Sequence, residues 1–199
     1  MIEKKSTTWL VRIGVLIAII VLMSFTPVGY LKVGTVEITF LMIPVIIGAI
    51  TLGAKSGAIL GAVFGITSFI QCFGMSSFGI ILLSINPVFT FLTCMVPRIL
   101  MGWLTGIIFE ALYKKDNTKG HALSFIVSSI VAPLLNTFFF MLFVIVLFGS
   151  SDYITELQAG RNIFAFVVWF VGINGAIEAA VSFIVGGSVG KAIYKVVNK

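Results

Sequence analysis

Hydrophobic and polar positions divide this chain into long apolar runs that are separated by short polar breaks. A helix needs about 20 apolar residues to cross a bilayer, and fewer where loops or neighbouring helices shield its ends. No long linker interrupts the runs, so residues 1–199 are expected to form one domain, a compact all-α bundle. Six membrane-spanning helices are predicted, over residues 9–25, 38–54, 56–73, 83–113, 122–148 and 162–194.

The stretch from Ser56 to Pro97 carries no charge and is too long for a single membrane-spanning helix. The chain must therefore fold back within it. Glycines and serines cluster in residues 74–79, and Asn86-Pro87 follows near the start of the next apolar run. Both features are typical of a break between helices. We expect a loop at residues 74–79, and a second loop at residues 149–160.

Composition agrees with a membrane protein. Hydrophobic residues make up 59% of the chain and charged residues 10%, and the mean hydropathy is +1.18. Soluble domains average about 25% charged residues, so this chain could not cover a soluble surface and is expected to sit in a lipid bilayer. The net charge of +6 would also fit a nucleic-acid-binding protein. The positions of the charges argue against nucleic acid and for an orientation in the membrane.

Six spans place both termini on one side of the membrane, and most lysines and arginines then share that side. Lys32 and Arg161 alone fall on the other side. Cationic residues accumulate on the cytoplasmic side of membrane proteins, so both termini are predicted to be cytoplasmic. The residues on the predicted cytoplasmic side are Lys4, Lys5, Arg12, Lys55, Lys114, Lys115, Lys119, Lys191, Lys195 and Lys199.

Arg98 and Glu178 are isolated charges deep inside apolar runs. A charge at the centre of a membrane helix costs at least ~2.5–3.5 kcal/mol on insertion scales, so such residues pair with one another or line a functional site. With a rise of about 1.5 Å per residue, Arg98, Asn136, Asn174 and Glu178 all lie roughly 18–24 Å below the outer ends of their helices. Four polar side chains from three helices are thus predicted to converge at one depth.

Two interpretations of these residues remain open. Arg98 and Glu178 could simply pair and hold two helices together. Alternatively, they and the asparagines could line a ligand cavity that opens to the outside. Asn86 and Thr90 lie on one helical face that leads inwards from the outer end towards Arg98, which fits such a cavity.

Other residues argue against enzymatic chemistry. No predicted span contains an aspartate, and His121, the one histidine, lies in a polar loop. The sequence shows no nucleophile–base pair, metal cluster or cofactor motif. We therefore expect the protein not to be an enzyme and to bind neither a metal nor a cofactor. Cys72 and Cys94 are interpreted as small core residues, because two thiols in apolar context form neither a disulfide framework nor a zinc site.

Small residues four apart mark close helix contacts in membranes. Each such pair could pack inside the protein or against a partner protein. Four pairs have this spacing: Gly14 and Ala18, Gly57 and Gly61, Gly102 and Gly106, and Gly186 and Gly190.

Several stretches together resemble the substrate-binding S components of energy-coupling factor (ECF) vitamin transporters, and among these the pantothenate type. The resemblance covers nearly the whole chain. It rests on residues 39–61 (TFLMIPVIIGAITLGAKSGAILG), on Asn86-Pro87, and on residues 96–102 (VPRILMG), 133–137 (PLLNT) and 172–178 (GINGAIE).

The resemblance implies a division of labour. The chain would bind a water-soluble vitamin, with pantothenate expected, in a bacterial cytoplasmic membrane. A transmembrane coupling subunit and two cytoplasmic ATPase subunits would supply the energy, as parts of an ECF-type ABC importer. By the same resemblance, Gly14 and Ala18 would meet the coupling subunit. Ligand contacts would come from residues 26–37, from the loop around Ser76-Ser77, and from Asn86, Thr90, Arg98, Asn136, Asn174 and Glu178.

Pantothenate suits this set of side chains, because it carries a carboxylate, an amide and two hydroxyls. A guanidinium binds a carboxylate in two-pronged fashion, and asparagines offer both donors and acceptors. If Glu178 neutralises Arg98 instead, a neutral vitamin would fit as well. Two classes of alternative remain. One is an S component for another vitamin, such as folate or riboflavin. The other, outside the family, is a small membrane enzyme or a scaffold subunit.

Overall fold

The computed structural model describes residues 2–26, 29–33, 36–115, 121–183 and 192. Helices dominate these ranges, as the apolar runs predict. The described elements are α1 (Ile2–Ser24), β1 (Tyr30–Val33), β2 (Val36–Thr39), α2 (Met42–Leu52), α3 (Ala54–Gln71), α4 (Ser77–Ile85), α5 (Pro87–Tyr113), α6 (Ala122–Phe148), α7 (Asp152–Gln158) and α8 (Ile163–Val181).

Four of these helices, α1, α3, α5 and α6, are long and apolar enough to cross a membrane. Helix α2 is apolar but has only 11 residues. These helices define a multi-pass membrane protein. The predicted helix over residues 122–148 matches α6 at both ends. The end of the sixth predicted span, beyond residue 183, falls almost entirely outside the described residues, so six crossings remain a prediction.

One short β-hairpin is added to the predicted helices. Strands β1 and β2 pair antiparallel, with Tyr30 opposite Thr39 and Val33 opposite Val36. The hairpin occupies much of the predicted outer loop and the first residues of the second predicted span. That span is correspondingly shorter, because α2 begins only at Met42. Side chains in residues 30–39 alternate and include several β-branched residues, which is the ordinary signal for a hairpin.

The two predicted outer loops are also partly helical. Residues 77–85 form α4, which Ser76 caps by accepting a hydrogen bond from the Gly79 backbone N–H at 3.3 Å. Residues 152–158 form α7, which Ser151 caps in the same way. Helix α5 consequently begins at Pro87, later than predicted, with Asn86 as its N-cap.

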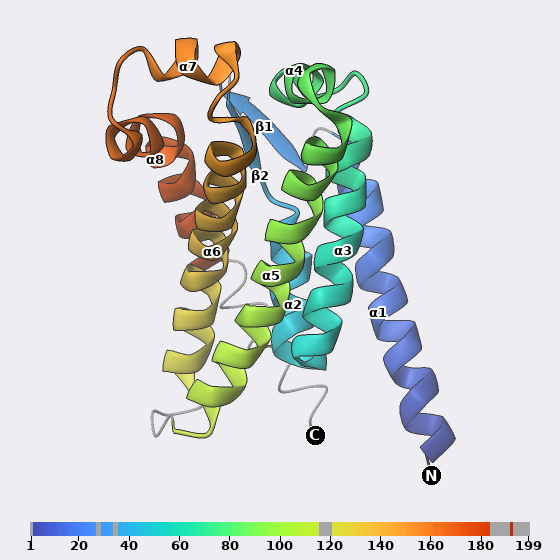
Figure 1. Ribbon diagram of the computed structural model, residues 1–199. Helices are drawn as coiled ribbons and strands as arrows, with labels where there is room; N and C mark the ends of the chain where they lie inside the picture. The colour runs from blue at the N-terminus through green and yellow to red at the C-terminus, as the bar shows by residue number, and fades with distance from the viewer. Residues whose placement is uncertain (1, 27–28, 34–35, 116–120, 184–191, 193–199) are drawn as a thin grey trace.

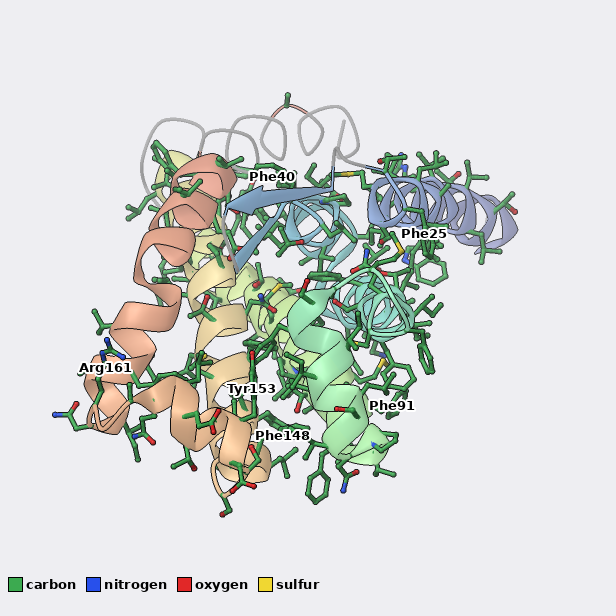
Figure 2. All side chains as sticks on the ribbon, turned by 90° about the horizontal axis from the view of Figure 1, so that it is seen from above. Phe25, Phe40, Phe91, Phe148, Tyr153 and Arg161 are labelled. Atoms are coloured by element: carbon green, nitrogen blue, oxygen red, sulfur yellow. The ribbon has the colours of Figure 1, made fainter. Side chains whose placement is uncertain are left out.

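The elements form a bundle with two distinct ends. Helices α1 and α8 lie at opposite edges, and α3, α5 and α6 lie between them (Figure 1). The hairpin, α4 and α7 gather at one end, and the beginning of α1 and the end of α5 lie towards the other. The first end is called the capped end below. Seen from this end, α1 and α8 again occupy opposite sides (Figure 2).

Glycines bring α3 and α5 together, and these two helices form the most extensive contact of the bundle. A Cβ on Gly57 would overlap the Gly102 carbonyl oxygen, and one on Gly61 would overlap the Arg98 carbonyl oxygen. Gly106 lies equally close to Ala54. The pairs on α3 and α5 therefore pack inside the protein, whereas Gly186 and Gly190 lie outside the described residues. This contact, the α3–α5 seam, sets the position of Arg98 relative to α3.

Candidate functional site

Arg98 folds back onto its own helix because of the residue before it. Pro97 lies inside α5 and has no N–H, so the Thr93 carbonyl oxygen four residues earlier lacks its helical donor. The Arg98 side chain supplies that donor, with Nη1 at 2.9 Å from the Thr93 oxygen. Pro97 thus leaves the Thr93 carbonyl oxygen without a backbone donor, and Arg98 donates to that oxygen instead.

Two aromatic rings hold the Arg98 guanidinium from different helices. Its Cζ atom lies 4.9 Å from the ring centre of Phe140 on α6, and 5.4 Å from that of Phe64 on α3. Both distances are within the range of cation–π attraction. The guanidinium is therefore fixed between α3 and α6, on the side of α5 that faces the bundle.

One edge of this guanidinium remains unused. Nε is buried and has no hydrogen-bond partner in the part of the chain that the structure describes. Within the described residues, Nη1 makes the sole hydrogen bond of the side chain. The edge formed by Nε and Nη2 presents two parallel N–H groups, which is the geometry that a carboxylate accepts in two-pronged fashion. Arg98 is thus placed to receive an anionic group.

Asn136 supplies a second unpaired group. Its side chain is 6% exposed, and its Oδ1 atom has no hydrogen-bond partner. Asn136 precedes Phe140 by one helical turn on α6, so the two side chains share a face, and Phe140 contacts Arg98. A buried amide oxygen without a donor is destabilising, and a ligand hydroxyl or amide would satisfy it.

Glu178 has a partner other than Arg98. Its side chain on α8 is 6% exposed, and Oε1 accepts a hydrogen bond from the Thr39 backbone N–H at 2.9 Å. In the described part of the chain, Glu178 and Arg98 form no ion pair with each other: Glu178 accepts from the Thr39 N–H, and Arg98 donates to the Thr93 carbonyl oxygen. Glu178 therefore ties the end of the hairpin to α8, and the direct pair considered from the sequence is not formed in this structure.

The remaining predicted site residues divide into two groups. Asn86 and Thr90 form hydrogen bonds with backbone groups at the start of α5. Asn86 Oδ1 accepts from the Val88 and Phe89 N–H groups at 3.0 and 3.1 Å. The fully buried Thr90 hydroxyl donates to the Asn86 carbonyl oxygen at 2.9 Å. Asn174 belongs to α8, but its side chain lies outside the described residues.

An aromatic cluster covers the site at the capped end. Phe78 on α4 lies 6.3 Å from Phe140 and 6.2 Å from Tyr153 on α7, measured between ring centres. Phe148 belongs to the same cluster, and Figure 2 shows it beside Tyr153. Because Phe140 contacts both Arg98 and Phe78, this cluster connects the arginine directly to α4 and α7.

Sequence reasoning missed several of these contacts. Phe140 could have been found, because it follows Asn136 by four residues and must share its face. The Arg98–Thr93 hydrogen bond could have been found from the proline at the intervening position. The contacts of Phe64 and Thr39 depend on tertiary packing, and no local pattern indicates them.

Gly14 and Ala18 lie on a face of α1 that the described residues leave uncovered. Both residues are exposed, and a Cβ on Gly14 would meet no atom within 4 Å. Large apolar side chains flank them: Val11 is 60% exposed, Val15 54% and Leu22 67%. Gly14 therefore differs from the glycines of the α3–α5 seam, where atoms of the facing helix occupy the space beside each glycine.

Comparison with known proteins identifies the family of this chain. A family model described as "ECF transporter, substrate-specific component" matches residues 9–186. The chain belongs to this family, and it is thus a transporter component rather than an enzyme. A curated relative, the pantothenate transporter PanT of Leuconostoc mesenteroides subsp. mesenteroides, is 25% identical over 203 residues, which cover 99% of this chain and 97% of the relative.

Proposed function

We propose that this chain is the high-affinity pantothenate-binding subunit of an ECF-type importer. The observation that carries the proposal is the Arg98 guanidinium, which is held between Phe64 and Phe140 with its Nε buried and unpaired. The family supplies the class of transporter, and the name of the Leuconostoc relative supports the choice of vitamin.

The polar groups of pantothenate match those of the site. Its carboxylate would bind the Nε–Nη2 edge of Arg98, because a guanidinium pairs with a carboxylate through two parallel hydrogen bonds. A hydroxyl or amide N–H would donate to Asn136 Oδ1, which has no donor among the described residues. Asn174 and Glu178 on α8 would contact the remaining polar groups, and Asn86 and Thr90 would line the approach from the capped end.

The proposed topology has six spans, with both termini in the cytoplasm of a bacterial cell. In the structure, Lys55 lies in the first turn of α3 and Lys114-Lys115 follow α5, whereas Lys32 belongs to the hairpin at the capped end. This separation supports a capped end that faces outwards. Lys119, Lys191, Lys195 and Lys199 lie outside the described residues.

The proposed partners are a transmembrane coupling subunit and two cytoplasmic ATPase subunits, which would hydrolyse ATP for uptake. The uncovered face around Gly14 and Ala18 is the proposed contact with the coupling subunit, because small residues let two helices approach closely in a membrane. The chain itself would bind the vitamin and catalyse no covalent step.

The test is a comparison of two ligands that differ at one group. Purified protein in detergent is titrated calorimetrically with pantothenate and with pantothenol, in which an alcohol replaces the carboxylate. We expect pantothenate to bind at least about 30-fold more tightly, since the alcohol leaves the buried guanidinium without its anion. Riboflavin and folate serve as further ligands. Binding of either of them in place of pantothenate would refute the proposed vitamin and keep the class of transporter.

A further inference from the structure

Cys72 and Cys94 bring their thiols together at the capped end of the bundle. Their sulfur atoms lie 3.8 Å apart, although the residues belong to different helices and are 22 positions apart in the sequence. Cys72 is the C-cap residue of α3, and Cys94 lies in the outer half of α5. Both side chains are buried, at 4% and 7% exposure. The sequence alone places each cysteine in an apolar core and does not bring them into contact.

We propose that Cys72 and Cys94 form a reversible disulfide that links α3 to α5. A disulfide requires sulfur atoms about 2.0 Å apart, so the two thiols must approach each other further when the bond forms. The proposal rests on the two thiols and not on a bound vitamin, so either proposal can fail without the other.

Cys72 is itself buried, but the residues that follow it are exposed. Phe73, the next residue, is 67% exposed, and Met75 is 48% exposed. Gly74 between them is also exposed and has a φ of 148°, so the chain turns sharply directly after the cysteine. Cys72 thus adjoins an exposed turn, whereas Cys94 lies within helix α5. We therefore assign Cys72 as the thiol that reacts first.

The oxidant is a small-molecule disulfide, and the reaction is thiol–disulfide exchange. The Cys72 thiolate attacks one sulfur of the small disulfide, and a small-molecule thiolate leaves. The Cys94 thiolate then attacks Cys72 in the mixed disulfide and displaces the second small thiol. Two cysteines are oxidised, one small disulfide is reduced to two thiols, and the two cysteine protons end on those thiols.

A bond at this place would stiffen the outer corner of the molecule. Gly79 of α4 packs directly on Cys72, since a Cβ there would lie 2.6 Å from the Cys72 sulfur. Cys94 precedes Arg98 by one turn of α5 and shares its helical face. The disulfide would therefore fix α3 and α5 to each other beneath α4, next to the turn that carries the arginine.

The experiment uses folded, detergent-solubilised full-length protein incubated with glutathione disulfide. We expect intact-mass spectrometry to show the loss of two hydrogen atoms, and peptide mapping to identify a Cys72–Cys94 link. Dithiothreitol should reverse both changes. The melting temperature of the oxidised protein should rise by on the order of 5 °C, because the link constrains the unfolded chain. An unchanged melting temperature would contradict the stiffening.

Single variants provide the matched controls. Cys72→Ser and Cys94→Ser each retain one thiol and a side chain of similar size, so neither can lose two hydrogen atoms. We expect the remaining thiol to stay reduced or to gain one glutathione. Wild-type protein that keeps both thiols available for alkylation after unfolding, or that carries a glutathione on each cysteine, would overturn the proposal.

Discussion

Arg98 is the residue on which the proposed ligand specificity depends. If it binds a carboxylate, Arg98→Ala removes a charge-assisted contact from a desolvated place and should weaken pantothenate binding by about 2–5 kcal/mol, or roughly 30- to several-thousand-fold. Arg98→Lys should recover only part of this loss, because an ammonium offers a point charge in place of a planar fork. The measurement is calorimetric titration of each variant after a folding check by size exclusion.

A double variant separates ligand binding from a purely structural role. Arg98→Met together with Glu178→Met removes both charges and leaves no stranded ion. We expect this protein to fold and to bind pantothenate as poorly as Arg98→Ala. A folded double variant that binds the vitamin like the wild type would exclude both residues from the ligand site.

Glu178 is expected to stabilise the folded protein by holding the end of the hairpin against α8. Glu178→Gln keeps an oxygen that can accept from the Thr39 N–H, whereas Glu178→Ala leaves that buried donor unpaired. An unpaired buried donor costs about 1–3 kcal/mol, so the alanine variant should melt at a lower temperature than the glutamine variant. Equal melting temperatures in detergent would mean that this hydrogen bond does not hold the hairpin.

For single residues, the sequence pattern predicted which polar side chains lie deep in the apolar helices, but it did not predict what each of them contacts. Arg98, Asn136 and Glu178 were predicted to lie at one depth because helical rise is regular. Their partners lie on other elements: Phe64 on α3 and Thr39 at the end of β2. Such contacts follow from how helices pack, and a single apolar sequence is compatible with many packings.

Helix α1 and the α3–α5 seam give opposite predictions for the same substitution. Gly14→Leu points a side chain into space that the described residues leave open, so folding and pantothenate binding should persist. Uptake by the complete transporter should fail, because the added bulk keeps a partner helix away. Ala18→Leu should behave in the same way.

Gly61→Leu is the matched control on the seam. A side chain there would overlap the α5 backbone at Arg98, so the protein should aggregate or lose its melting transition. Size exclusion, binding and uptake into proteoliposomes are measured for all three variants. Loss of binding in Gly14→Leu to the same degree as in Gly61→Leu would show that the α1 face is not a docking surface.

The elements were predicted well where length and hydrophobicity decide them. Helix α6 begins and ends where the apolar run does. Short elements were missed because their signals lie in a few residues: the alternation in residues 30–39, and the Ser76 and Asn86 caps that separate α4 from its neighbours. These caps were visible in the sequence, whereas the position of α4 over Cys72 was not.

The orientation of the whole molecule is tested by labelling in intact cells. The natural cysteines are first replaced by Cys72→Ser and Cys94→Ser. A cysteine introduced at Asp152, at the start of α7, should then react with membrane-impermeant maleimide. One introduced at Lys115, at the opposite end of the bundle, should react only with a permeant reagent. Labelling of both positions from outside would contradict the six-span topology.

Pro97 has a consequence for how this protein can change over evolution. A substitution such as Pro97→Ala would restore the backbone N–H that donates to the Thr93 oxygen, and the arginine would then compete with its own helix for that acceptor. A change at position 97 would thus alter the contacts of Arg98, the residue proposed to bind the ligand, without altering its identity. We expect natural relatives to gain or lose the proline and the arginine together, as one inherited unit.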